Sequence, residues 1–155
     1  MGLAVIAYCD VTPWDELSES ARDGRSPEED GIRFQNDPAF ADRLAPLEEG
    51  YYQATESHRE YIGSYHYYGE WRTWLSRTFP SAFQELVDFS DSYGSLGPNA
   101  ICSLRVDFED WEERVRDMAE TPSPDGDDIN SYFETFQQFR RCFEAAGSDG
   151  VVKFS

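Results

Sequence analysis

The fold of this chain is decided first by residues 101–118, ICSLRVDFEDWEERVRDM. Apolar side chains recur there at intervals of 3, 4, 3, 4 and 3 residues, which is the repeat of one face of an α-helix. The stripe consists of Ile101, Leu104, Phe108, Trp111, Val115 and Met118. Carboxylates fill half of the other positions, so the stretch predicts an amphipathic helix that packs one side on a core.

Further elements extend outward from this helix. Residues 130–146 carry a second helical stripe and end at Gly147, a residue that suits a helix C-terminus. Residues 3–9 form a continuous apolar run typical of a buried strand, and residues 151–154 predict a terminal strand that pairs with it. These elements predict a single α+β domain spanning residues 1–155, with a small sheet that includes both termini packed against four or five helices.

The middle of the chain is less regular. We expect a short helix over residues 37–47 with Asp37 as its N-cap, a helix over residues 68–79, and another that begins at Ser81. Residues 50–61 are ambiguous and favour a strand, because tyrosines alternate there with polar residues. Residues 10–31 are polar and rich in carboxylates, which predicts a surface loop.

Charge limits the partners of the protein. The chain has 155 residues, with 31 Asp plus Glu against 13 Lys plus Arg, a net charge of −18. Such a surface repels nucleic acid and anionic membranes and attracts basic proteins. Aromatic residues make up 15% of the chain, which predicts a folded, ring-rich core because acidic disordered chains are poor in them. An acidic proteome is an equally good explanation of the charge.

Location and redox state follow from the apolar and sulfur-containing residues. The longest apolar run is too short to span a bilayer and has no signal-peptide features, so a cytoplasmic protein is expected. Cys9, Cys102 and Cys142 are odd in number and far apart, which predicts buried free thiols rather than disulfides or metal ligands.

No motif identifies a reaction, and a non-enzymatic role is favoured. Glu56, His58 and Glu60 would share one face of a strand, as a metal or acid–base cluster could, although a solvated polar face explains them more simply. No metal site and no cofactor are expected.

One candidate ligand-binding pocket stands out, although packing of a ring-rich core is the simpler explanation of its aromatic residues. Four tyrosines and a histidine lie within residues 61–68, Arg72 follows one helical turn later, and a glycine-rich loop covers residues 89–97. Together these could stack a ring and hold a small anionic, nucleotide-like ligand. The candidate ligand-binding residues are Ser64, Tyr65, Tyr68, Arg72, Ser90, Asp91, Gly94 and Gly97.

The chain also resembles a group of small uncharacterised bacterial and phage-encoded proteins. In that group a Ser-Tyr-x-x-Tyr-x-x-Trp-Arg segment precedes a Phe-Ser-Asp-x-x-Gly-x-x-Gly loop, as at residues 64–72 and 89–97 here. The resemblance covers residues 61–154 and implies a shared pocket rather than a reaction. Many members have Cys-Glu where this chain has Ser92 and Tyr93.

Three functions compete. The first is an acidic inhibitor of the immunity or anti-defence type that masks a basic, nucleic-acid-binding partner, using exposed rings such as Trp14, Tyr67 and Tyr93 as anchors. The second is a module that binds or hydrolyses a small ligand in the pocket described above. The third is a domain whose charge serves solubility alone. The sequence favours the first, with no direct binding to nucleic acid or membrane.

Overall fold

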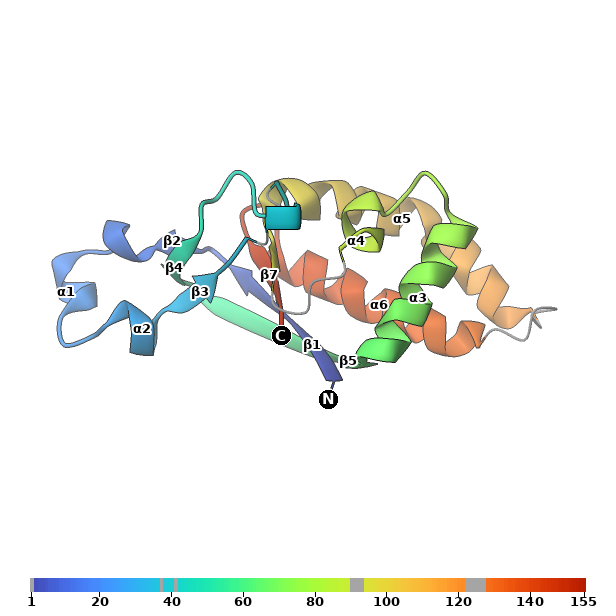
Figure 1. Cartoon of the computed structure of the whole chain (residues 1–155), viewed down its shortest axis with the longest axis horizontal. Coiled ribbons are helices and arrows are strands. Elements are labelled where there is room, and N and C mark those ends of the chain that lie inside the picture. Colours follow the sequence, from blue (N-terminus) through green and yellow to red (C-terminus); the bar gives the residue numbers. More distant parts are fainter. Residues whose placement is uncertain (1, 37, 41, 90–93, 122–127) are drawn as a thin grey trace.

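The computed structural model describes residues 2–36, 38–40, 42–89, 94–121 and 128–155. Within these residues, six α-helices and seven strands form an α+β fold (Figure 1), which confirms the predicted class. Three of the six helices have only four residues each. The strands form two antiparallel sheets where the sequence predicted one.

The main sheet has the strand order β5-β1-β7-β6. Its strands are β1 (Gly2–Cys9), β5 (Glu56–Ser64), β6 (Ser95–Leu96) and β7 (Val151–Phe154). The strands from the two chain ends pair directly at its centre, Val5 opposite Phe154 and Tyr8 opposite Val151. This pairing confirms the expected terminal sheet.

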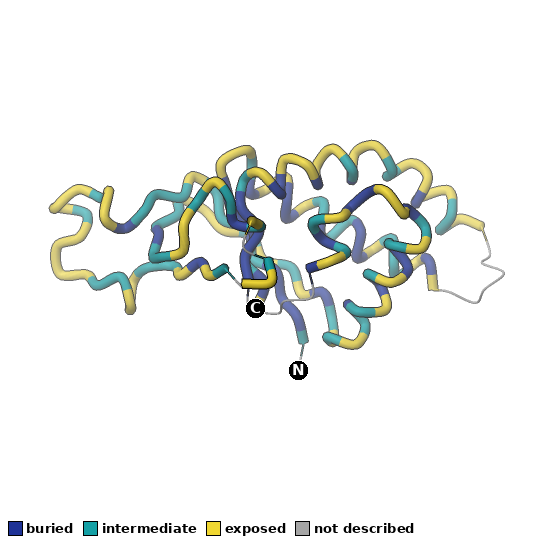
Figure 2. The backbone as a smooth tube through the Cα atoms, turned by 45° about the horizontal axis from the view of Figure 1, so that its top comes forward, coloured by how far each residue is buried: buried dark blue, intermediate teal, exposed yellow. Residues whose placement is uncertain are grey.

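Three long helices cover one face of this sheet (Figure 1): α3 (Tyr65–Thr78), α5 (Pro98–Glu120) and α6 (Ile129–Ala146). The apolar stripe of α5 faces inward as predicted. Ile101, Leu104, Phe108 and Val115 are buried, and Trp111 and Met118 pack at the margin. Figure 2 shows α5 alternating between buried and exposed residues along its length.

Aromatic rings join the helices to the sheet. Phe139 of α6 stacks on Trp71 of α3 with 4.9 Å between ring centroids, and it also contacts Phe154 of β7 at 6.1 Å. All three side chains are fully buried. The predicted ring-rich core therefore lies where α3, α6 and β7 meet.

A smaller sheet of order β2-β4-β3 supports a projecting segment. Its strands are β2 (Thr12–Pro13), β3 (Ile32–Phe34) and β4 (Gly50–Gln53). Between β2 and β3 lie η1 (Trp14–Glu16), α1 (Glu19–Arg22) and α2 (Pro27–Asp30), which extend away from the helical layer (Figure 1). A second core of Phe34, Leu44, Tyr52 and Val151 fixes this sheet against the first.

The prediction of a helix over residues 37–47 is wrong, because among the described residues only η2 (Pro38–Phe40) is helical there. Pro46 lacks the N–H that a helix interior requires. The carbonyls of Arg43 and Ala45 instead accept hydrogen bonds from the N–H groups of Gly97 and Asn99, at 2.8 and 3.2 Å. Asp37, the expected N-cap, lies outside the described residues.

Three other boundaries differ from expectation. The helix expected to begin at residue 68 begins at Tyr65, and the ambiguous stretch 50–61 divides between β4 and β5. The helix expected from Ser81 is the short α4 (Gln84–Val87). It cannot begin earlier because Phe83 has a left-handed conformation with φ of 59°, and Asp107 of α5 accepts the Phe83 N–H at 3.0 Å.

Candidate functional site

Two of the predicted pocket residues have structural partners at the start of α3. The Ser64 hydroxyl accepts the N–H of Tyr67 at 3.0 Å and is the N-cap of the helix. Tyr68 is buried, and its hydroxyl donates to the carbonyl of Phe89 at 3.0 Å. Burial raises the pKa of Tyr68, so the side chain is a neutral part of the core.

Arg72 is also bound within the fold. Its guanidinium carbon lies 4.8 Å from the Tyr68 ring centroid, and Nη1 donates to the carbonyl of Val87 at 3.0 Å. This contact ties α3 to the last residue of α4. Tyr65 and Arg72 do line one open hollow along α3, together with His66, Arg77 and Tyr132 of α6.

The two glycines of the predicted pocket are buried. The Gly94 carbonyl accepts the Phe154 N–H at 2.9 Å, beside the main sheet. A Cβ atom on Gly97 would lie 2.0 Å from the carbonyl oxygen of Leu44. Gly97 is thus explained by the close approach of two main-chain segments, without a ligand.

The structure therefore brings Tyr65, Tyr68 and Arg72 together and gives Ser64, Gly94 and Gly97 separate structural positions. Ser90 and Asp91 lie outside the described residues. The small-ligand pocket stays a prediction, because its proposed base, Asp91, is among them.

The Glu56, His58 and Glu60 motif lies on β5 as expected. His58 Nε2 and Glu60 Oε2 are 2.6 Å apart, and Arg141 Nη2 of α6 donates to Glu60 Oε1 at 2.9 Å. Glu60 thus joins β5 to α6. No group of three or more His, Cys, Asp and Glu residues that could hold a metal ion occurs within the described ranges.

Replacing Glu60 with glutamine is expected to reduce the loss of stability on acidification. Hydrogen bonds from Arg141, and secondarily from His58, hold the pKa of Glu60 below its ordinary value of 4.5. A pKa lowered by folding stabilises the protein above that ordinary value, and the contribution disappears as pH falls through the folded-state pKa. Urea unfolding midpoints at neutral pH and at about pH 3.5 measure the effect. The prediction would be contradicted if the two midpoints differed as much in Glu60→Gln as in the wild type. It would also be contradicted if the exposed Glu56→Gln control reduced that difference equally.

The cysteines only partly match expectation. Cys142 is buried, and desolvation raises the pKa of its thiol to about 12, so it is unreactive. Cys9 is half-buried, and Cys102 is exposed on α5. The prediction of three buried thiols is wrong for Cys102 because its position lies outside the apolar stripe of that helix.

The most distinctive surface is the segment of residues 10–31, which we call the acidic arm. It carries eight carboxylates against Arg22 and Arg25: Asp10, Asp15, Glu16, Glu19, Asp23, Glu28, Glu29 and Asp30. All eight are exposed, and Figure 2 shows how little of the arm is buried. Within the described part of the chain none of them forms an ion pair.

The arm is held by specific contacts. The Arg25 guanidinium lies 5.1 Å from the ring centroid of the buried Trp14. Its Nη1 donates to Ala21 O at 2.9 Å and to Gln53 Oε1 of β4 at 2.8 Å. Ser18 and Ser26 cap α1 and α2. These contacts present the carboxylates on an ordered backbone.

The rings expected to anchor a partner lie differently. Trp14 is 6% exposed, because it is the residue on which the arm packs. Tyr67 is half-buried, with its hydroxyl 2.8 Å from Thr135 Oγ1, and Tyr93 lies outside the described residues. The structure instead exposes Tyr61, at 63%. Side chains alternate between the two faces of β5, and Tyr61 lies on the exposed face. The sequence could not show this without knowing where the strand begins and ends.

The comparisons with known proteins find no matching family model, no similar curated protein and no similar solved structure. The resemblance to small bacterial and phage-encoded proteins therefore stays a prediction. Among the described helices, none combines the length and apolar character required to cross a bilayer.

Proposed function

We propose that the protein is a non-enzymatic inhibitor of the immunity or anti-defence class, which masks the basic, nucleic-acid-binding surface of a partner protein. The observation that carries the proposal is the acidic arm. Its eight exposed carboxylates project from the body on a segment that Arg25 and Trp14 hold in place.

The arrangement suits a masking role physically. A dense group of like charges steers an oppositely charged partner and raises the association rate by about 10 to 1,000-fold at low salt. The charges lie apart from the ring-rich core of α3, α5 and α6. A partner could therefore cover the arm without disturbing the packing that stabilises the fold.

The test uses the intact protein, immobilised, with an extract of the cells that produce it. The arm variant combines Glu16→Gln, Glu19→Gln, Asp23→Asn and Glu28→Gln, and it spares Asp30, which accepts the Ser26 N–H at 2.9 Å. We expect the wild type to retain a basic protein at low salt, and the arm variant to bind the purified partner about tenfold or more weakly.

A control variant removes the same number of charges from the exposed side of α5, through Glu109→Gln, Asp110→Asn, Glu113→Gln and Asp117→Asn. Equal losses in both variants would show that net charge, rather than the arm, governs binding. Retention of no basic protein at any salt concentration would overturn the proposal and favour a charge that serves solubility.

A further inference from the structure

Strand β5 is an outer strand of the main sheet, and its pairing shows which of its main-chain groups point away from β1. The N–H and C=O of Ala4 exchange 2.9 Å hydrogen bonds with Ser155, on the side of β7. Ala4 pairs with Tyr61 of β5, so this pair exchanges no main-chain hydrogen bonds. The main-chain groups of Tyr61 therefore point away from β1. The same alternation applies to Ser57 and Arg59, opposite Tyr8 and Ile6.

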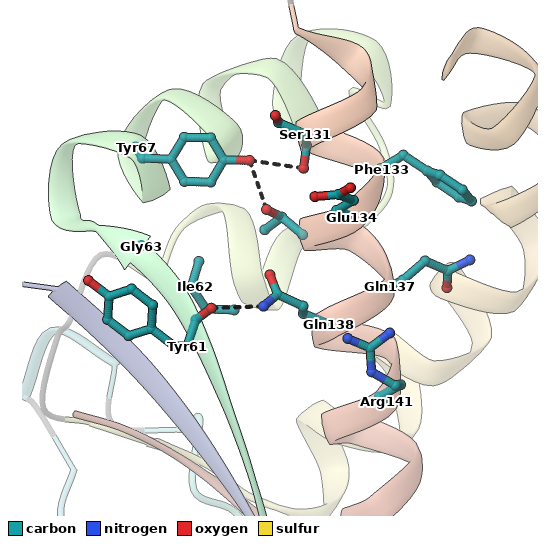
Figure 3. A pocket seen from close by; sticks show the side chains of 11 residues that line it. Tyr61, Ile62, Gly63, Tyr67, Ser131, Phe133, Glu134, Gln137, Gln138 and Arg141 are labelled. Carbon is teal, nitrogen blue, oxygen red and sulfur yellow. Dashed lines mark hydrogen bonds between the residues drawn. The ribbon is translucent and has the colours of Figure 1, made fainter. Parts of the chain in front are cut away.

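The outward edge of β5 thus presents the N–H and C=O groups of Ser57, Arg59 and Tyr61. Within the described residues, one of them has a protein partner: the Tyr61 carbonyl accepts Nε2 of Gln138 from α6 at 2.8 Å. Figure 3 shows this side-chain amide reaching across to the strand. The Gln138 amide donates to the Tyr61 carbonyl, the same acceptor that the main-chain N–H of an added strand would use.

A groove with a volume of about 670 Å³ lies between α6 and the end of β5 at residues 61–63 (Figure 3). Its walls mix polar and apolar surface and include Tyr67, Thr135 and Gln137. The two charged residues that line it are Glu134 and Arg141.

The charges of the groove favour a cation. Arg141 is paired with Glu60 at 2.9 Å, whereas Glu134 is exposed and has no ion pair among the described residues. The pKa of Tyr67 at the groove wall is raised, first by burial and also by the charges of Asp128 and Glu134. The exposed Glu134 carboxylate, without an ion pair among the described residues, therefore gives its side of the groove a negative potential.

We propose that the outer edge of β5 binds an extended basic segment of a partner protein by strand addition, with a Lys or Arg side chain entering the groove beside Glu134. An extended main chain matches outward groups that alternate along the strand, since it offers both donors and acceptors. A second copy of this chain carries the same net charge of −18 and would be repelled. The inference rests on the proposed function for the basic character of the partner.

The direct test is hydrogen exchange by NMR on the whole protein, with a blocked heptapeptide of alternating Val and Lys as the probe. We expect the amides of Ser57 and Arg59 to exchange about tenfold or more slowly at saturation. The amides of His58 and Glu60, which face β1, serve as internal references. Unchanged exchange at Ser57 and Arg59 with bound peptide would overturn the proposal, as would equal binding of a Val and Glu peptide.

Two changes test the main-chain and charge contacts separately. Ser57→Pro removes one outward N–H and leaves the hydrogen bonds to β1 intact. It should therefore lower the affinity for the Val and Lys peptide several-fold relative to Ser57→Ala. Glu134→Gln should lower the affinity for the same peptide about tenfold. If Ser57→Pro does not fold, a peptide N-methylated at its central residues tests the same hydrogen bonds from the other side. Equal affinity of N-methylated and unmodified peptides would contradict strand addition.

The same probe separates this inference from the proposed function. The arm variant should bind the peptide as the wild type does at about 0.15 M salt, where the Debye length is about 8 Å. Peptide binding without any retained basic protein would refute the inhibitor proposal alone. Retention of an arm-dependent partner with no peptide binding, and no effect of Glu134→Gln on the partner, would refute the edge proposal alone.

Discussion

Replacing Phe139 with alanine is expected to lower the free energy of unfolding by about 3–5 kcal/mol. Phe139 is fully buried in α6 and contacts Trp71 of α3, Phe154 of β7, and Tyr68 and Phe143. Removing the ring leaves a cavity at the junction of sheet and helices, and its stiff aromatic neighbours cannot readily fill it. Because the whole free energy of unfolding of such a domain is about 5–15 kcal/mol, the variant should be marginally stable.

The matched control is Phe133→Ala on the same helix. Phe133 is half-buried at the margin of the core, and it stacks on Phe136 at 6.4 Å between centroids. We expect a loss of about 1–2 kcal/mol there. Urea unfolding followed by tryptophan fluorescence measures both. Similar losses in the two variants would contradict the assignment of Phe139 to the centre of the core.

Gly97→Ala is the second change for which a large loss is expected, of about 3 kcal/mol or more. The added Cβ would lie 2.0 Å from the oxygen and 2.5 Å from the carbonyl carbon of Leu44. Relief requires movement of main chain, and it would lengthen the 2.8 Å hydrogen bond from Gly97 N to Arg43 O. It would also disturb the start of α5, since Gly97 is its N-cap.

Gly69→Ala provides the opposite expectation. Gly69 lies inside α3, and a Cβ there would meet no atom within 4 Å. Alanine should stabilise this helix by about 0.8–1 kcal/mol relative to glycine. Thermal unfolding of the two variants compares them directly. A melting temperature that falls for Gly69→Ala, or stays unchanged for Gly97→Ala, would show that the packing around these helices differs from that described.

The long amphipathic helices and the terminal strands could be predicted from sequence because each carries its own periodicity. The stripe from Ile101 to Met118 specifies one buried face whatever it packs against. The run from Leu3 to Cys9 is too apolar to lie on a surface, and Val151–Phe154 after a turn is the same kind of segment. Local spacing was sufficient for these elements.

Other elements depend on partners distant in sequence. Phe83 takes a left-handed conformation while Asp107 accepts its N–H, and no local pattern announces a contact 24 residues away. Residues 42–45 turn beside the start of α5 because Gly97 permits the approach. Residues 50–53 and 56–64 are separated by only two residues, yet they enter different sheets.

The candidate site shows the same division. The pairing of Tyr68 with Arg72 follows from helical spacing and is present. Gly94 and Gly97 were expected to admit a ligand, but their nearest neighbours are other main-chain segments of the fold. A position can require glycine because a ligand comes close to the main chain there, or because another segment of the same chain does. The sequence does not distinguish these two cases.

The sequence by itself determined the charge of −18, the ring-rich core, the helices around residues 98–120 and 129–146, and the strands at both ends. These are properties of composition and short-range periodicity. The tertiary structure alone decided that the carboxylates of residues 10–31 project on an arm, that Trp14 supports it, and that β5 is an outer strand whose end at Tyr61 shares a groove with Glu134. Such features arise from contacts between segments far apart in sequence, and local spacing does not encode them.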